Sequence, residues 1–151
     1  MRIFALLALC LFLNQPIVGM AEPVQIDGPA GPLGGELITA ERARHIVVII
    51  PGSGPTDRDG NSAQMGLRSN TYKLLAEGLK AAGVSSLRID KRGFYSSAAA
   101  ISDPNNVTIG AYAEDARKWV ERASQEASCV WIAGHSEGGL VALAAAQASP
   151  C

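Results

Sequence analysis

Three candidate strands that alternate with stretches of helical periodicity constrain the fold of this chain more than any other feature. They cover 45–50, 84–90 and 129–133, and the first is an apolar run that reads His-Ile-Val-Val-Ile-Ile. Continuous β-branched runs are typical of strands that are covered on both faces. Because parallel strands need a crossover connection, the alternation predicts an α/β fold, with a mostly parallel sheet and helices on both of its faces.

Helices are expected in the intervals between these strands. Apolar residues recur at helical spacing over 72–82 and 109–123, and an Ala-rich stretch covers 140–148. Gly83 supplies a stop for the first helix, and Thr108 is the expected N-cap of the second. Before them, 24–26 and 33–39 read as two short strands joined by a turn-rich connection, which predicts an antiparallel start to the sheet.

Composition and charge exclude several classes of protein. The chain has 151 residues, enough for one domain, and is 48% hydrophobic, so it can form a core. Thirteen Lys and Arg against fourteen Asp and Glu, with no block of one sign, argue against a nucleic-acid partner. The cysteines and histidines lack the spacing of a zinc site, so we expect no metal and no cofactor.

The N-terminus has the pattern of a secretory signal. Met1-Arg2 is followed by an apolar run over 3–13, and Gly19 and Ala21 suit a cleavage site after Ala21. The run is about half the roughly 20 residues that a membrane span needs, so no stable membrane anchor is expected. Residues 1–21 are therefore interpreted as a signal peptide, 22–151 as the mature domain, and the protein as secreted or periplasmic.

Two cysteines remain in that mature chain. Cys129 and Cys151 can form a disulfide. The simpler interpretation is that Cys129, at the start of an apolar strand, is a small buried hydrophobic residue.

One motif carries chemistry. Gly134-His-Ser-Glu-Gly138 fits Gly-x-Ser-x-Gly, in which a strained turn between a strand and a helix exposes a serine hydroxyl. The apolar strand ends at Ala133 and a helix begins just after Ser136, which is the context that the motif requires. Ser136 is therefore the candidate nucleophile. The alternative is a glycine-rich turn with an incidental serine N-cap.

A serine nucleophile for acyl transfer needs two N–H groups directed at the developing oxyanion. The backbone N–H of Glu137, which follows the serine, is one candidate. The second is expected from the loop after the first parallel strand, where Ser53 N–H is preferred and Gly54 N–H is the alternative. This polar loop, 52–70, is long, and long loops in compact domains are usually functional. The other interpretation of Gly-Ser-Gly-Pro, at 52–55, is a flexible turn.

Three motifs together resemble a known family. They are Pro-Gly-Ser-Gly-Pro-Thr-Asp-Arg-Asp-Gly-Asn at 51–61, Asp-Lys-Arg-Gly at 90–93 and Gly-His-Ser-Glu-Gly-Gly at 134–139. In this order and spacing they are similar to the α/β-hydrolase superfamily, and within it to the serine aminopeptidase-like branch, which includes secreted carboxylesterases. The resemblance extends over 24–148. It implies a Ser-Asp-His hydrolase of carboxylic esters or related acyl compounds, with a small-molecule substrate.

The chain departs from the family pattern at two places. Pro51 stands where a histidine commonly precedes the oxyanion glycine, and Phe94-Tyr95-Ser96 replace a stretch that usually holds a further glycine. Neither change removes a catalytic group, but both are expected to reshape the rim of the site.

Other polar residues near these motifs are assigned structural roles. Asp57, Arg58 and Asp59 read as turn residues rather than pocket residues. Asp90 and Arg92, at the end of a strand, are expected to fix the following loop by ion pairing.

The histidines and tryptophans are also interpreted as structural. His135 should point away from the serine hydroxyl, and His45 lies at the strand end opposite the active end, so neither is expected to be a base. Trp119 and Trp131 are expected on the core faces of a helix and a strand.

The sequence contains no complete triad. In this fold the serine precedes an acid and then a histidine along the chain. Residues 137–151 contain no histidine, and no acid except Glu137, which adjoins the nucleophile. The chain is therefore interpreted as the N-terminal portion of a hydrolase domain, inactive alone, whose uncovered sheet edge favours self-association.

Of three other function classes, the sequence excludes one and leaves two as alternatives. A dinucleotide-binding loop fails because Asp57 stands where the third glycine of Gly-x-Gly-x-x-Gly belongs. A non-catalytic binding module or remnant on the hydrolase scaffold and a serine peptidase of the aminopeptidase type both remain as alternatives.

Overall fold

The central feature of the structure is a five-stranded sheet with the strand order β1-β2-β6-β3-β7. This computed structural model describes residues 21–146. The sheet strands are β1 (Glu22–Asp27), β2 (Pro32–Ile38), β3 (His45–Ile50), β6 (Ser85–Ile89) and β7 (Cys129–Gly134). The helices are α1 (Thr71–Ala81), α2 (Ile109–Ala123) and α3 (Glu137–Ala145). The predicted α/β fold is confirmed, because β6, β3 and β7 are parallel and β1 and β2 form the antiparallel start.

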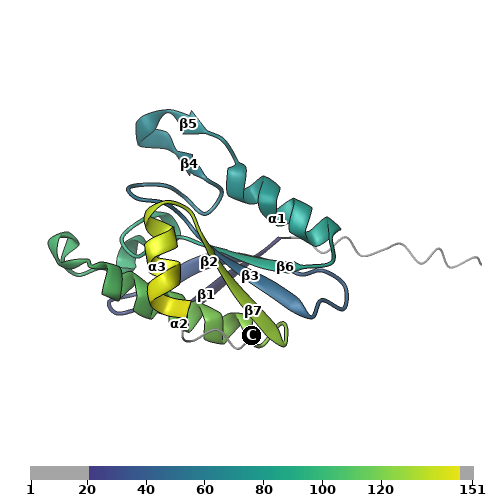
Figure 1. Cartoon of the computed structure of the whole chain (residues 1–151). Coiled ribbons are helices and arrows are strands. Elements are labelled where there is room, and N and C mark those ends of the chain that lie inside the picture. The colour runs from purple at the N-terminus through teal and green to yellow at the C-terminus, as the bar shows by residue number, and fades with distance from the viewer. Residues whose placement is uncertain (1–20, 147–151) are drawn as a thin grey trace, which may run out of the picture.

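Helices cover both faces of the sheet. α2 and α3 lie on one face and α1 on the other (Figure 1). Side chains of β3 alternate between these layers, with Ile46, Val48 and Ile50 in the α2 and α3 core and Val47 and Ile49 on the α1 side. This two-sided burial is why β3 reads as an unbroken apolar run.

The expected helix signals are present. The Thr108 side chain accepts a hydrogen bond of 3.1 Å from the N–H of Ala111, as an N-cap does. Gly83 follows α1 in the left-handed conformation, with φ at 79°. α3 begins at Glu137, directly after the motif serine.

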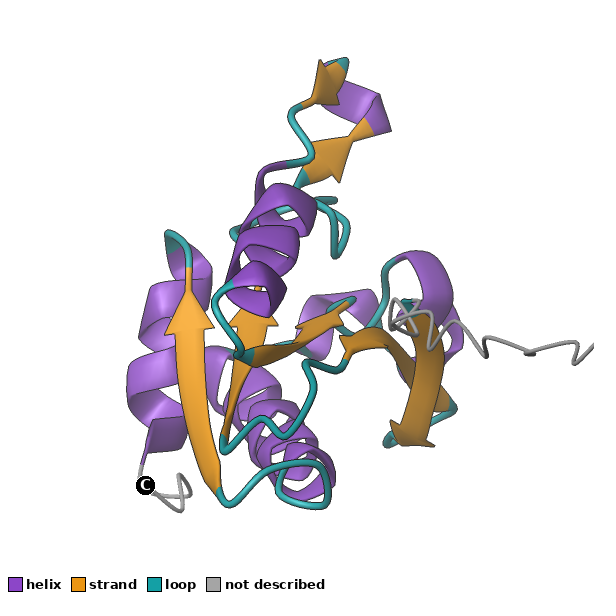
Figure 2. Cartoon of the chain, turned by 90° about the vertical axis from the view of Figure 1, so that its right-hand side faces the viewer, coloured by secondary structure: helices purple, strands orange, loops and turns teal. Residues whose placement is uncertain are grey.

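The loop over 52–70 is more ordered in structure than its composition suggests. It contains a small hairpin of β4 (Asn61–Ser62) and β5 (Leu67–Arg68), joined by the 3₁₀ turn η1 (Ala63–Met65). Figure 2 shows this hairpin standing out beyond the N-terminal end of α1. Two further 3₁₀ segments, η2 (Tyr95–Ala100) and η3 (Pro104–Asn106), lie between β6 and α2.

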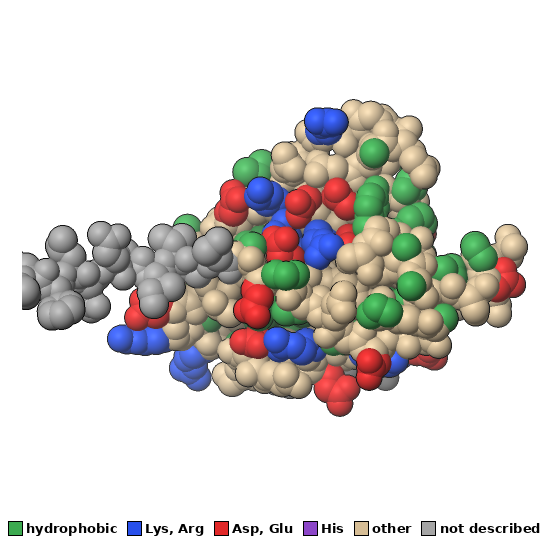
Figure 3. Space-filling view, turned by 180° about the vertical axis from the view of Figure 1, so that it is seen from behind, with side chains coloured by type: hydrophobic (Ala, Val, Ile, Leu, Met, Phe, Trp, Pro, Cys, Tyr) green, Lys and Arg blue, Asp and Glu red, His purple; other side chains and the backbone are tan. Residues whose placement is uncertain are grey.

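Arg88 lies in the middle of β6 and is only 1% exposed. Its guanidinium forms ion pairs with Glu36 of β2 and with Asp59 of the loop after β3. These carboxylates compensate the cost of burying the charge, and they tie the loop to the sheet. Acidic and basic side chains are interspersed on the face of the molecule that Figure 3 shows, which is the one seen from behind in the view of Figure 1.

Trp119 is confirmed as a core residue with 0% exposure, but the prediction for Trp131 is wrong. Trp131 is 54% exposed, although it lies on a strand. It pairs in register with Val47 and shares the α1 face, but α1 packs on β6 and β2, on the far side of β3. Its indole N–H instead donates to His45 Nδ1 at 3.2 Å.

The simpler interpretation of Cys129 is also wrong, because Cys129 is disulfide-bonded. The other cysteines, Cys10 and Cys151, lie outside the described residues. The same holds for residues 1–20 of the predicted signal peptide and for the last two residues of the helix predicted over 140–148. Among residues 21–146, no helix is long and apolar enough to cross a membrane.

The β7 and α3 surface carries a cluster of exposed apolar side chains. Trp131, Leu140 and Leu143, here called the β7–α3 patch, are 54%, 59% and 75% exposed. Trp131 and Leu143 line a hollow of about 440 Å³, and Leu140 lies on α3 with Leu143. β7 is also an edge of the sheet within the described residues. Exposed apolar patches beside a strand edge favour association with another chain.

We therefore expect the chain to self-associate through the β7–α3 patch. Leu143→Lys should weaken this association by about tenfold or more, because burying a leucine side chain contributes roughly 1.5–3 kcal/mol. Sedimentation velocity over a concentration series measures the effect. The matched control is Leu74→Lys, because Leu74 is 60% exposed on α1 and lies outside the patch. An equal change in both variants would contradict the prediction.

Candidate active site

Ser136 occupies a strained turn between β7 and α3. Its φ and ψ are 53° and −121°, a combination that non-glycine residues rarely adopt. Such strain persists only where the surrounding structure enforces it, and it is common at functional sites. The N–H groups of Gly138 and Gly139 donate to the carbonyls of His135 and Ser136, each at 2.9 Å, and close the turn.

The two flanking glycines of the motif are required by close backbone contacts. A Cβ on Gly134 would collide with the carbonyl of Gly138. A Cβ on Gly138 would lie 2.5 Å from the carbonyl oxygens of both Ile50 and Pro51. The turn is thus pressed against the end of β3, which brings Ser136 to the loop that begins at Gly52.

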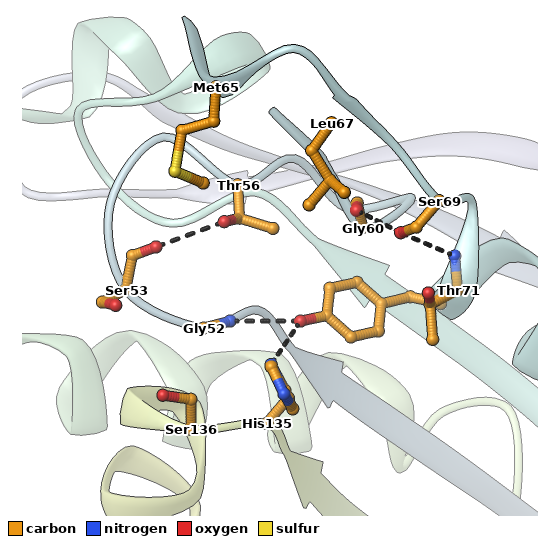
Figure 4. Close-up of a pocket in the computed structure, with 11 residues that line it drawn as sticks. Gly52, Ser53, Thr56, Gly60, Met65, Leu67, Ser69, Thr71, His135 and Ser136 are labelled. Atoms are coloured by element: carbon orange, nitrogen blue, oxygen red, sulfur yellow. Dashed lines mark hydrogen bonds between the residues drawn. The ribbon is translucent and has the colours of Figure 1, made fainter. Parts of the chain in front are cut away.

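Ser136 opens into a cleft of about 380 Å³. The lining residues come from the loop after β3, the β4–β5 hairpin, the start of α1 and the serine turn: Gly52, Ser53, Thr56, Gly60, Met65, Leu67, Ser69, Thr71, Tyr72, His135 and Ser136. Figure 4 shows Ser53 and Ser136 on the same side of this cleft. The structure therefore brings the candidate nucleophile and the preferred oxyanion residue to one cavity.

The other two residues of the predicted site lie beside the cleft rather than in its lining. Gly54 is exposed and has φ at 69°. Glu137 is the first residue of α3, so its N–H is one of the free amides at a helix N-terminus. The helix dipole there favours negative charge.

Tyr72 is a site residue that the sequence reasoning assigned only to a helix face. Its side chain is 7% exposed, and its hydroxyl accepts a hydrogen bond of 3.4 Å from the N–H of Gly52. The same hydroxyl lies 3.0 Å from His135 Nδ1 (Figure 4). Through this contact His135 links the serine turn to α1.

An ion pair between Lys91 and Glu137 anchors the start of α3. Lys91, which is 3% exposed, lies with its Nζ 2.6 Å from Glu137 Oε1. The ammonium also lies 5.0 Å from the centre of the Tyr112 ring. Burial, and then the charge of Glu137, raise the pKa of Tyr112 above its ordinary value. The pair holds the Glu137 side chain in place directly after the nucleophile.

Asp90 and Arg92 fix the loop after β6 by ion pairing, as predicted. Asp90 is 1% exposed and accepts hydrogen bonds from the Arg58 N–H at 2.9 Å and the Ser96 hydroxyl at 2.6 Å. The Arg58 guanidinium lies 2.8 Å from the same carboxylate. Arg92 binds Asp115 through two nitrogens, and this hydrogen bonding raises the pKa of Arg92.

The turn interpretation of 57–59 is confirmed for Asp57 and incomplete for the other two residues. Asp57 Oδ1 accepts from the N–H groups of Asp59 and Asn61 at 2.9 and 2.7 Å, an Asx turn. Arg58 and Asp59 take part in the ion pairs described above.

A mostly parallel sheet with helices on both faces and a strained serine between β7 and α3 together define the α/β-hydrolase fold. The family model described as Serine aminopeptidase, S33, matches residues 64–151. The chain belongs to this family. The match begins at residue 64, whereas the resemblance seen in the sequence begins at residue 24. The part of the loop that contains Ser53 therefore lies outside the match. No curated protein matches the sequence.

Solved structures support the same fold assignment. A lidless α/β serine hydrolase from Xanthomonas campestris is 24% identical, with a TM-score of 0.62, over 85% of this chain and 56% of that one. Dienelactone hydrolase from Anabaena variabilis is 25% identical, with a TM-score of 0.63, over 84% and 56% of the two chains. Est1E from Butyrivibrio proteoclasticus, which has ferulic acid bound, is 24% identical, with a TM-score of 0.61, over 82% and 46%. The chain thus spans about half the length of these structures.

Proposed function

We propose that this chain contributes the nucleophile and the oxyanion-binding groups of a serine hydrolase that cleaves carboxylic esters or related acyl compounds. In this mechanism Ser136 Oγ attacks the substrate carbonyl carbon while a general base takes the hydroxyl proton. The bond to the alcohol then breaks, the alcohol leaves with that proton, and the acyl group remains on Ser136 until water releases it as the carboxylic acid. The N–H groups of Ser53 and Glu137 stabilise the oxyanion, with Gly54 as the alternative to Ser53. The single observation that carries the proposal is the strained backbone of Ser136, with φ at 53°, at the mouth of a cleft shared with Ser53.

The chemistry of the cleft favours an ester over the N-terminus of a peptide. An aminopeptidase must recognise a positively charged amino group, for which a carboxylate is the usual partner. The lining of the cleft, as far as the described residues form it, contains no Asp or Glu. A neutral ester meets no unpaired charge there, so we place esters ahead of peptides. Dienelactone hydrolase, among the similar structures, also acts on an ester, by its name.

The proposed chemistry also requires a general base. Among the described residues, neither histidine forms a hydrogen bond with the Ser136 hydroxyl: His135 Nδ1 contacts Tyr72, and His45 Nδ1 contacts Trp131. His45 also lies at the start of β3, opposite the end that leads to Gly52. We therefore assign the role of the base to neither histidine of the described residues.

Acylation with an added base tests the proposal. We expect p-nitrophenyl acetate to acetylate Ser136 when imidazole is supplied, with p-nitrophenolate leaving and the serine proton passing to imidazole. Free imidazole reaches every exposed serine alike, so the excess acetylation at Ser136 measures the oxyanion-binding N–H groups, each of which contributes about 10²–10³ to such a step. Peptide mass spectrometry locates the acetyl group, and Ser136→Ala is the control. Acetylation spread evenly over exposed serines would reject Ser136 as the nucleophile.

A further inference from the structure

The β4–β5 hairpin is firmly anchored at its base. Asn61 is the centre of this anchor: its N–H donates to Asp57 Oδ1 at 2.7 Å, and its side-chain amide exchanges hydrogen bonds of 3.0 and 2.9 Å with Asn70. The Ser69 hydroxyl donates to the Gly60 carbonyl at 2.6 Å. The hairpin is therefore held at a defined position over the cleft.

The tip of this hairpin presents two large apolar side chains to the cleft. Met65 is 64% exposed and Leu67 is 44% exposed, and both line the cavity that Ser136 lines. Figure 4 shows them pointing into the cleft from the side across from Ser136. Single exposed apolar residues are ordinary on protein surfaces, but two on an anchored element facing a candidate nucleophile form a binding wall.

Several polar groups that line the same cleft already have partners within the protein. The Thr56 hydroxyl donates to the Ser53 carbonyl at 3.2 Å, and Ser69 is bonded to Gly60. The Tyr72 hydroxyl contacts Gly52 and His135. A ligand group next to the hairpin thus meets Met65 and Leu67 rather than these hydroxyls.

We infer that Met65 and Leu67 form the binding site for the acyl group of the substrate, and that this group is a small, uncharged aliphatic chain. The inference rests on the proposed function, because in the proposed acyl-enzyme the acyl group stays on Ser136 and must fit the cleft that Ser136 lines. A cavity of about 380 Å³ is at the small end of the range for ligand pockets. The absence of Asp, Glu, Lys and Arg from the described lining disfavours a charged acyl group.

Binding of amides that are not hydrolysed tests this inference without requiring catalysis. The probes are hexanamide, the shorter acetamide and 6-aminohexanamide, which has the same length as hexanamide and a charged end. We expect hexanamide to bind at least about tenfold more tightly than either of the others, since its additional methylenes are buried against the wall. Saturation-transfer difference NMR measures the affinities, and because it observes the ligand it tolerates self-association of the protein.

Variants locate the site. Met65→Asn and Leu67→Asn should each weaken hexanamide binding by several fold, while Leu74→Asn, an equivalent change on exposed α1 surface, should leave it unchanged. Ser136→Ala should also retain binding, which separates this inference from the proposed function. Equal affinity for hexanamide and acetamide, or wild-type binding by both hairpin variants, would overturn the inference. Failure of Ser136 acetylation with retained hexanamide binding would instead overturn the proposed function alone.

Discussion

Without added base, hydrolysis of p-nitrophenyl acetate by the 151-residue chain is expected to proceed at the same rate in the wild type and in Ser136→Ala. Removing members of a serine triad lowers kcat by about 10⁴–10⁶, because an unassisted hydroxyl is a poor nucleophile. Residues 137–151 contain no histidine, and among the described residues neither His135 nor His45 is hydrogen-bonded to the Ser136 hydroxyl. Initial rates of p-nitrophenolate release, corrected for spontaneous hydrolysis, measure the difference.

A Ser136-dependent rate in the wild type would contradict this expectation. One of the two histidines would then be acting as the base. His135→Ala and His45→Ala identify which, because only the variant that lacks the base would lose the rate.

The parts of the fold that could be predicted are those that depend on local pattern. The strand at 45–50 was predicted with the bounds that β3 has, because burial on both faces leaves a continuous β-branched run. Thr108 was identified as an N-cap because a side-chain oxygen at that position satisfies a free N–H of the helix. The strand, turn and helix around Ser136 follow from the same kind of local signal.

The parts that could not be predicted depend on contacts between distant residues. Arg88 reads as a charge within a strand, and its partners Glu36 and Asp59 are 52 and 29 positions away. Tyr72 fits an apolar helix face, and nothing local indicates that its hydroxyl joins Gly52 to His135, 63 positions away. A single sequence does not show which distant residues meet in the fold. It therefore gives no signal for the ion pairs of Arg88 or for the hydrogen bonds of the Tyr72 hydroxyl.

Trp131 and Lys91 illustrate two further limits. The alternation of a strand places Trp131 on one face, but it does not show whether a helix extends far enough to cover that face. In the sequence, Lys91 stands out only as part of the Asp-Lys-Arg-Gly motif. In the structure it forms an ion pair with Glu137, the residue after the nucleophile. The sequence does contain a signal for this ion pair. The lysine follows a buried strand, the glutamate follows the motif serine, and the ends of parallel strands meet at the same edge of a sheet.

Gly138→Ala is expected to destabilise the protein by about 3 kcal/mol or more, the upper range of overpacking, because the new Cβ would lie 2.5 Å from the carbonyl oxygens of Ile50 and Pro51. Both oxygens belong to backbone, so relief requires the serine turn to move away from the end of β3. Such a loss is a large fraction of the roughly 5–15 kcal/mol that stabilises a typical domain, and Tm should fall by about 10 °C or more.

Gly78→Ala is the matched control for this substitution. Gly78 lies in α1, its Cβ would meet no atom within 4 Å, and its backbone has no positive φ. Replacing an exposed helical glycine by alanine should stabilise by about 0.5–1 kcal/mol, so the two changes should have opposite signs. Thermal unfolding followed by circular dichroism measures both. If Gly138→Ala unfolded at the wild-type temperature, the close packing of the serine turn on β3 would be refuted, and with it the physical reason why Ser136 is held at the cleft.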